Sequence, residues 1–219
     1  MPRAKKTSLN CTGAELPDIP IVKLSPVPES LDDFCQVLQP EDEVLLHEYL
    51  SEPQKHYWVI IQADDYPMAV CELEAYADYM QTQNQWTGRR SDYLLIGSSH
   101  GKCCLIVVEL RHVLVKAQQE EDKLAQLREA IKQLIQNHLA IVDQTDCLAK
   151  VYDKPEAYTI VGVIIAPGAT RNFNRRELNR REEIESHPVL LVTLPSNALS
   201  DCRITWTRLM EKIGFLPKG

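Results

Sequence analysis

The sequence has no apolar run long enough to cross a membrane. Its longest such runs, CCLIVV at 103–108 and YTIVGVIIA at 158–166, are far shorter than the roughly 18–20 residues that a membrane-spanning helix needs. No apolar segment follows the basic start MPRAKKTSLN, so we expect no secretory signal and no membrane partner. The phosphate-loop, dinucleotide-binding, HExxH and GxSxG patterns are also missing, which leaves nucleotide-dependent, zinc-peptidase and serine-hydrolase functions without support.

Cysteine is present, but its pattern lacks the signs of two common uses. The chain has 7 cysteines, an odd number, and no CxxC pair. This argues against a disulfide framework and against a structural zinc site. We therefore expect free thiols and a reducing, cytoplasmic setting.

An excess of positive charge is lacking too. Lys and Arg number 24 against 31 Asp and Glu, which gives a net charge of −7. Bulk charge therefore does not favour nucleic-acid binding, although a local basic patch would still allow it. Apolar residues make up 44% of the 219 residues and charged residues 25%. This composition and length are typical of a globular protein of one domain, or at most two small ones.

Proline separates the start of the chain from the rest. Five prolines lie between positions 2 and 28, and proline at that density favours extended backbone and excludes helix interiors. We expect residues 1–30 to form an extended arm that lies on a single domain spanning residues 31–219.

Helical and strand patterns alternate along that domain. Helices are expected at 41–51, 68–83, about 118–139 and about 201–213, the last with Ser200 placed to cap its N-terminus. Strands are expected at 57–62, 92–97, 103–111, 158–165 and 189–194. Because two of these strands are nearly continuous apolar runs, the pattern predicts an α/β sandwich with a sheet buried on both faces.

The strand at 103–111 carries a carboxylate where one is costly. Successive side chains of a strand point to opposite faces, so Val107, Glu109 and Arg111 share one face. Glu109 follows an apolar run and precedes Leu110. A carboxylate at the end of a buried strand destabilises the fold unless something compensates its charge.

Hairpin geometry adds a second acid to the same face. A two-residue turn at 100–101, in which the glycine supplies a positive φ, makes Ser99 face Lys102. In that register Asp92 falls directly opposite Glu109. Two carboxylates forced together share a proton or hold a cation. We therefore expect a hard divalent cation, Mg²⁺ or Mn²⁺, between them.

The run GRRSDYLLIG, a turn and then CLIVVELR resemble the PD-(D/E)XK nuclease superfamily, which has the restriction-endonuclease-like fold. The signature of that superfamily is an Asp at the start of one strand and Glu-x-Lys at the end of the next, followed by a helix. Asp92 matches the first acid, Glu109 the second, and Arg111 stands at the lysine position. The resemblance covers roughly residues 68–166, and the helix and strand expected there follow in the family's order.

The resemblance implies a three-layer sandwich, with a central mixed sheet and helices on both faces, and metal-assisted hydrolysis of nucleic-acid phosphodiesters. Asp92, Glu109 and the backbone carbonyl of Leu110 would hold Mg²⁺ or Mn²⁺, with DNA the expected substrate rather than RNA. Arg111 departs from the family because arginine cannot lose its proton as lysine can. It could still neutralise charge on the phosphate in the transition state.

The sequence leaves two members of such a site open. Three lysines could supply the displaced amine, namely Lys102, Lys116 and Lys123. The family also carries an acid on its first core helix, and four residues compete for that place, namely Glu72, Glu74, Glu43 and Glu48.

A non-enzymatic function is the rival hypothesis. Arg111 and the acidic total favour a catalytically degenerate member of the fold that acts as a DNA-binding or regulatory subunit and could form a homodimer. In that case Asp92, Glu109 and Arg111 are a structural charge cluster. The arginine-rich stretch at 171–181 offers phosphate contacts, but its interleaved glutamates also fit a solvated helix with ion pairs.

Overall fold

The large sheet of the protein has seven strands and is mixed. The computed structural model describes residues 11–13, 15–48, 56–99, 101–111, 117–151, 158–166, 179–195, 199 and 201–214. The strand order is β2-β5-β6-β7-β8-β10-β9. The strands are β2 (Cys35–Leu38), β5 (Met68–Glu72), β6 (Tyr93–Ser99), β7 (Lys102–Leu110), β8 (Tyr158–Ala166), β9 (Asn179–Ile184) and β10 (His187–Pro195). β7, β8 and β10 are parallel neighbours, and the other pairs are antiparallel.

A smaller sheet packs beside the large one. It consists of β1 (Thr12–Gly13), β3 (Glu43–Glu48), β4 (His56–Gln62) and β11 (Arg203–Thr205). β4 is central, because β3 pairs with it along one edge while β1 and β11 pair with the other edge. The small sheet contributes the buried residues Val44, Leu46, Val59 and Ile61 to a core that it shares with the large sheet.

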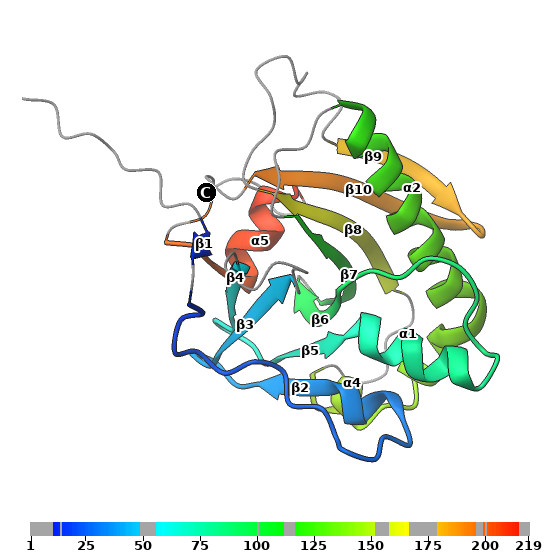
Figure 1. Cartoon of the computed structure of the whole chain (residues 1–219), viewed down its shortest axis with the longest axis horizontal. Helices are drawn as coiled ribbons and strands as arrows, with labels where there is room; N and C mark the ends of the chain where they lie inside the picture. The colour runs from blue at the N-terminus through cyan, green and yellow to red at the C-terminus, as the bar shows by residue number, and fades with distance from the viewer. Residues whose placement is uncertain are drawn as a thin grey trace, which may run out of the picture.

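Helices cover the sheets on two sides (Figure 1). They are the 3₁₀ helix η1 (Leu31–Phe34), α1 (Leu73–Thr82), α2 (Ala117–Gln133), the π-helical turn η2 (Leu134–His138), α3 (Leu139–Val142), α4 (Asp146–Val151) and α5 (Trp206–Lys212). One face of the large sheet forms a core with α1, α2 and α4. The other face forms a core with α5 and the small sheet. The coarse prediction of a mixed α/β protein with a doubly covered sheet is therefore confirmed.

The hairpin of β6 and β7 has the predicted register. Ser99 pairs with Lys102, and the ladder continues to Tyr93 opposite Val108. Gly101 has a φ of 71°, a conformation that glycine adopts without a steric penalty. The predicted alternation of faces is also confirmed, since odd-numbered residues of β7 from 103 to 107 face the α1–α2 core and even-numbered ones from 104 to 110 face the other.

The helix expected at 118–139 is found, and a glycine lets it lie close to the sheet. α2 is followed without a break by η2 and α3, which extend the helical stretch to Val142. A Cβ atom added at Gly162 on β8 would lie 2.7 Å from side-chain carbons of Leu127 and Leu191. Glycine at this position therefore allows α2 to pack tightly across β8.

Three predicted helices differ from the structure. Residues 43–48 of the expected helix 41–51 form strand β3, because pairing with β4 outweighs the local helical pattern. The first part of the expected helix 68–83 is the fully buried strand β5, and α1 begins only at Leu73. In the expected helix 201–213, β11 comes first and Thr205 caps α5 by accepting a hydrogen bond from the Arg208 amide. Ser200 lies outside the described residues.

The expectation of no disulfides is wrong. Cys11 is bonded to Cys202, which ties the start of the described chain to the segment before β11. Cys35 is bonded to Cys71, its partner in the β2–β5 ladder. The number and spacing of the cysteines did not indicate these bonds, because cysteines far apart in sequence meet only in the folded sheets. The other three cysteines, Cys103, Cys104 and Cys147, are free and buried.

The arm and the arginine-rich stretch are described in part. Residues 1–10 and 171–178 lie outside the described residues. From Cys11 onward the arm lies on the small sheet, where Pro20 accepts a hydrogen bond from Leu45 at 2.7 Å and Val22 is buried. Residues 179–184 form strand β9 rather than a helix. Within the described part of the chain, no helix is long and apolar enough to cross a membrane.

Candidate functional site

Asp92 and Glu109 lie together where β6 begins and β7 ends. Asp92 immediately precedes Tyr93, so it follows directly on the last ladder pair. Its Oδ2 accepts a hydrogen bond of 2.5 Å from the amide of Leu110. Glu109 is only 1% exposed, whereas Asp92 is partly buried. The residue types and the register that the sequence predicted therefore place two acids at one end of the hairpin.

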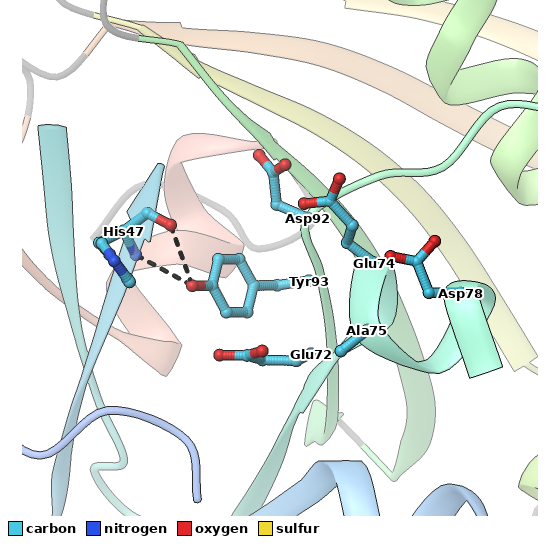
Figure 2. A pocket seen from close by; sticks show the side chains of 7 residues that line it. All are labelled: His47, Glu72, Glu74, Ala75, Asp78, Asp92 and Tyr93. Atoms are coloured by element: carbon cyan, nitrogen blue, oxygen red, sulfur yellow. Dashed lines mark hydrogen bonds between the residues drawn. The ribbon is translucent and has the colours of Figure 1, made fainter. Parts of the chain in front are cut away.

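Helix α1 brings a third acid to this pair. The amides of Leu73 and Glu74, at the start of α1, donate hydrogen bonds of 3.0 and 3.3 Å to the carbonyl of Asp92. Glu74 therefore stands next to Asp92, and Figure 2 shows the two carboxylates side by side. Among the four acids that the sequence left open, Glu74 is the helical acid that the structure brings to the pair. We call Asp92, Glu109 and Glu74 the acid site.

The other three acids have different places. Glu43 forms an ion pair of 2.7 Å with Arg203 on β11. Glu48, at the end of β3, contacts Arg111. Glu72 is buried at the start of α1, and in Figure 2 its carboxylate points beneath the ring of Tyr93 rather than toward Asp92. β3 was predicted as a helix, and its true pairing is what brings Glu48 within reach of Arg111.

Arg111 bridges the carboxylates of Glu109 and Glu48. One guanidinium nitrogen lies 2.6 Å from Oε1 of Glu109, and another lies 3.3 Å from Oε1 of Glu48. The Arg111 side chain is 19% exposed, so solvent screens these contacts only partly. Arg111 therefore stands beside the acids, as the sequence predicted, and it carries a fixed charge.

Lys123 on α2 reaches the same acid from the helix side. Its Nζ lies 3.4 Å from Oε1 of Glu109. Lys102 is at the opposite end of β7, seven residues and roughly 23 Å away from Glu109. Lys116 lies outside the described residues. Of the candidate amines that the structure describes, Lys123 is the one at the acid site.

Gln126 is a member of the site that the sequence analysis missed. Its amide nitrogen donates to the carbonyl of Arg90 at 2.7 Å and lies 3.4 Å from Oε2 of Glu109. Its amide oxygen accepts a hydrogen bond of 2.6 Å from Lys123. The spacing of three residues puts Gln126 on the same helix face as Lys123, which is the signal that could have found it.

Asp92 and Glu109 hold their protons unusually tightly. Burial raises the pKa of Glu109 to about 7, although the neighbouring Arg111 acts in the opposite direction. Burial and then the charge of Glu109 raise the pKa of Asp92 well above its ordinary value, and Glu74 and Glu48 add to the effect. Arg111 and Lys123 thus leave part of the negative charge of these four carboxylates uncompensated.

A pocket opens on the α1 side of Asp92. It has a volume of about 200 Å³ and is lined by His47, Glu72, Glu74, Ala75, Asp78, Asp92 and Tyr93. The Tyr93 hydroxyl donates to the His47 carbonyl at 3.1 Å and lies 3.0 Å from the His47 amide, which closes one side of the pocket (Figure 2). Burial lowers the pKa of His47, so its ring is neutral at pH 7. The pocket is therefore acidic without a cationic side chain among its lining residues.

The residues present fit a hard divalent cation. Oδ2 of Asp92 is held by the amide of Leu110, which fixes the position of the carboxylate. Mg²⁺ is usually bound through one or two carboxylates, with water filling the remaining positions. Across the described residues, no group of three or more His, Cys, Asp or Glu could hold a metal ion. A cation at Asp92 and Glu109 would therefore have two of these side chains as ligands and water in most of its other positions.

Comparison with known proteins adds no relative. No protein-family model, no curated protein and no solved structure matches the chain.

Proposed function

We propose that the protein is a metal-dependent nuclease that hydrolyses phosphodiesters of nucleic acid, with DNA the expected substrate. The observation that carries the proposal is the pair Asp92 and Glu109, two adjacent acids whose pKa values are raised by burial and by neighbouring carboxylates. An arrangement that disfavours its own charged form is stabilised by a bound cation. The resemblance to the PD-(D/E)XK signature supports the same function, and we propose a restriction-endonuclease-like core.

Each residue of the site has a role in this proposal. Asp92, Glu109 and the carbonyl of Leu110 would hold Mg²⁺ or Mn²⁺, and Glu74 on α1 adds negative charge beside Asp92. When bound, the ion polarises the phosphate and lowers the pKa of the attacking water. Arg111 holds Glu109 in place and neutralises charge on the phosphate.

Lys123 takes the place that the family gives to lysine. It contacts Glu109 from α2, the carboxylate that Arg111 also contacts. Lysine can lose its proton when its pKa is lowered, whereas arginine stays protonated. The structure thus offers an amine to compensate for the arginine at position 111, and Gln126 orients that amine through a hydrogen bond of 2.6 Å.

Metal titration and DNA cleavage together test this function. Mg²⁺ or Mn²⁺ is titrated calorimetrically into the wild-type protein and into Asp92→Asn, and both proteins are then incubated with plasmid and with single-stranded DNA. We expect binding and cleavage in the wild type and neither in Asp92→Asn. Asp78→Asn is the matched control, because Asp78 lines the same pocket but pairs with Arg90. Absence of both metal binding and cleavage in the wild type contradicts the proposal.

One observation favours a second candidate function. Arg111 and Lys123 already occupy positions beside Glu109, as they would in a structural charge cluster. A catalytically degenerate domain that serves as a DNA-binding or regulatory subunit would keep such a cluster without metal. DNA binding that persists unchanged in the presence of a chelator and in Asp92→Asn, with no cleavage, favours this candidate over the nuclease.

The cytoplasm is the compartment we propose for a nuclease that acts on cellular DNA. The two disulfides are the observation against it, because reducing compartments keep such cysteines as thiols. Trapping thiols in freshly lysed cells decides the question. Labelling of all seven cysteines would support the cytoplasm, and labelling of only the three free ones would contradict it.

A further inference from the structure

A second pocket lies along α2, beyond the acid site. It has a volume of about 530 Å³ and is lined by Asn84, Gln85, Thr87, Gln133, Asn137 and His138. We call it the amide pocket. Four of its six side chains are amides, each of which offers two donors and an acceptor. None of the six is a lysine, arginine, aspartate or glutamate, so the pocket is polar without being charged. Its volume is within the range of pockets that bind small molecules.

A π-helical turn shapes the wall of this pocket. The turn Leu134–His138 interrupts the helix that begins with α2 and carries both Asn137 and His138. Such turns are rare and are frequent at functional sites. The Gln133 amide is held before any ligand arrives, because its oxygen accepts from Asn137 at 3.3 Å and from the Thr87 amide at 3.4 Å.

His138 gives the pocket a buried group that is short of a partner. The residue is 1% exposed, and its Nδ1 lies 2.9 Å from the hydroxyl of Tyr76. Its Nε2 makes no hydrogen bond of good geometry within the described chain, and a poorly aligned one to the carbonyl of Gln85 raises its pKa slightly. Burial lowers that pKa, so the ring is neutral at pH 7. Buried polar groups normally find a partner, and a ligand in the pocket would supply one.

The amide pocket and the acid site lie along the same side of α2. The segment before β6 runs alongside the helix. The Arg90 carbonyl accepts a hydrogen bond from Gln126, and the Thr87 amide donates one to Gln133. Seven residues of helix separate these two glutamines, which corresponds to about 10 Å. That length corresponds to about three nucleotides at the rise of roughly 3.4 Å of a stacked strand, and to fewer where the strand is unstacked and extended.

We propose that the amide pocket binds a nucleobase, unstacked from the strand whose phosphate lies at the acid site. Amide side chains match the donor and acceptor pattern of base edges, and enzymes read unstacked bases through such contacts. The absence of a cation among the six lining residues makes a phosphate group an unsuitable ligand. This inference rests on the proposed function for its strand, and it makes single-stranded or locally opened DNA the substrate.

Oligonucleotides with one missing base test the proposal. A labelled single strand is prepared with an abasic site at each position in turn, and affinity is measured in a chelator so that no cleavage occurs. We expect one position, within about three nucleotides of the cleavage site mapped on the intact strand with metal, to lose at least about fivefold in affinity. In Asn137→Leu that position should no longer differ from the others. Asn137 is exposed, so the fold should tolerate the change.

A neighbouring variant and free nucleosides complete the test. Gln136→Leu changes an exposed residue beside the pocket that does not line it, and it should keep the position-specific loss. If the wild type binds all abasic strands with equal affinity, the amide pocket does not bind a base of the strand. If free nucleosides nevertheless bind in calorimetry and Asn137→Leu abolishes that binding, the nucleobase assignment stands and its source is a free nucleotide. If they do not bind either, the whole proposal is overturned.

The proposal of a nucleobase in the amide pocket and the proposal of a nuclease can fail independently. Asn137→Leu should bind Mg²⁺ as the wild type does, because Asn137 lies in η2, beyond the residues of α2 that contact Glu109, namely Lys123 and Gln126. A position-specific abasic effect without metal binding would support the amide pocket and contradict the nuclease. Metal-dependent cleavage with no abasic effect would support the nuclease and contradict the strand-bound base.

Discussion

Two groups of carboxylates lie against α2, and their positive partners compensate them differently. At one group, Arg128 pairs with Glu182 on β9 at 2.7 Å and with Glu121 at 2.9 Å, while Arg180 contacts Glu121 at 2.5 Å. We call these four residues the ion network. Its two cations match its two acids, and hydrogen bonds from Arg128 and then Arg180 lower the pKa of Glu121.

At the acid site the pKa values of the acids shift in the opposite direction. Asp92 and Glu109 have raised pKa values even though Arg111 and Lys123 stand beside Glu109. Burial and neighbouring carboxylates therefore outweigh the cations there. An ion network that serves stability lowers the pKa values of its acids, whereas a site that is incomplete without a further cation raises them. This difference is the physical reason for placing the metal at Asp92 and Glu109.

The largest expected effect is the loss of cleavage in Asp92→Asn. Asparagine keeps an oxygen that can accept the hydrogen bond from Leu110 but lacks the charge that binds the ion. We expect cleavage of plasmid DNA to fall by about a thousandfold or more, since metal catalysis contributes several kcal/mol. Glu182→Gln in the ion network should leave the rate unchanged. Equal losses in both variants would mean that the two groups of acids do not differ in function.

The second-largest effect concerns the amine of Lys123. Lys123→Met should lower the cleavage rate by about a hundredfold, because it removes a group that can transfer a proton or stabilise charge at the phosphate. Metal affinity measured by calorimetry should change little. Lys123→Arg separates the two roles. A rate that recovers in Lys123→Arg shows that charge alone matters and contradicts the assignment of Lys123 as the replacement for the family's lysine.

A smaller effect should appear in stability against pH without metal. A carboxyl whose pKa is raised in the folded protein binds its proton more tightly there than in the unfolded chain, so stability falls as pH rises through that interval. For Glu109, the shift from 4.5 to about 7 corresponds to on the order of 3 kcal/mol between pH 4 and pH 8. Chemical denaturation over this range measures it.

Two variants identify the groups that cause this fall in stability with rising pH. Glu109→Gln and Asp92→Asn should each flatten the fall in stability and make the metal-free protein more stable than the wild type at pH 8. Histidine titration is common to all three proteins and cancels in the comparison. A wild-type stability that rises from pH 4 to pH 8 as steeply as those of the variants would show that the acid site resembles the ion network.

The smallest effect belongs to the ion network itself. A double-mutant cycle with Arg128→Met and Glu182→Gln should give a coupling energy of about 0.5–1 kcal/mol, typical of partly exposed pairs. The coupling should weaken in high salt. None of the variants in the cycle should change Mg²⁺ affinity, and a change in affinity would tie the network to the metal.

The sequence predicts the acid pair but not its surroundings, and the reason is the range of the interactions. Asp92 and Glu109 meet because a two-residue turn and the two-residue period of a strand are local rules. Glu74 and Lys123 reach them only through the path of α1 and α2 over the sheet, which no local pattern specifies. Gln126 shares a helix face with Lys123, so it could have been found only once Lys123 had been placed at the site.

The small sheet shows the same limit at the level of the fold. Residues 43–48 have acids and apolar residues at spacings that suit a helix, but pairing with β4 makes them a strand. Both disulfides likewise join residues at least 36 positions apart, so spacing gave no sign of them. Long-range pairing decides these segments, and a single sequence does not display it.

The most direct test of the account is the count of protons released when Mg²⁺ binds. The ion is titrated calorimetrically at pH 6.5 in two buffers that differ in ionisation enthalpy, with the wild type and with Asp92→Asn. Because the raised pKa of Glu109, about 7, keeps this acid largely protonated at that pH, binding in the wild type should release about one proton per ion, and Asp92→Asn should show no binding. Wild-type binding that releases no proton, or binding that Asp92→Asn retains, would contradict a metal site at Asp92 and Glu109.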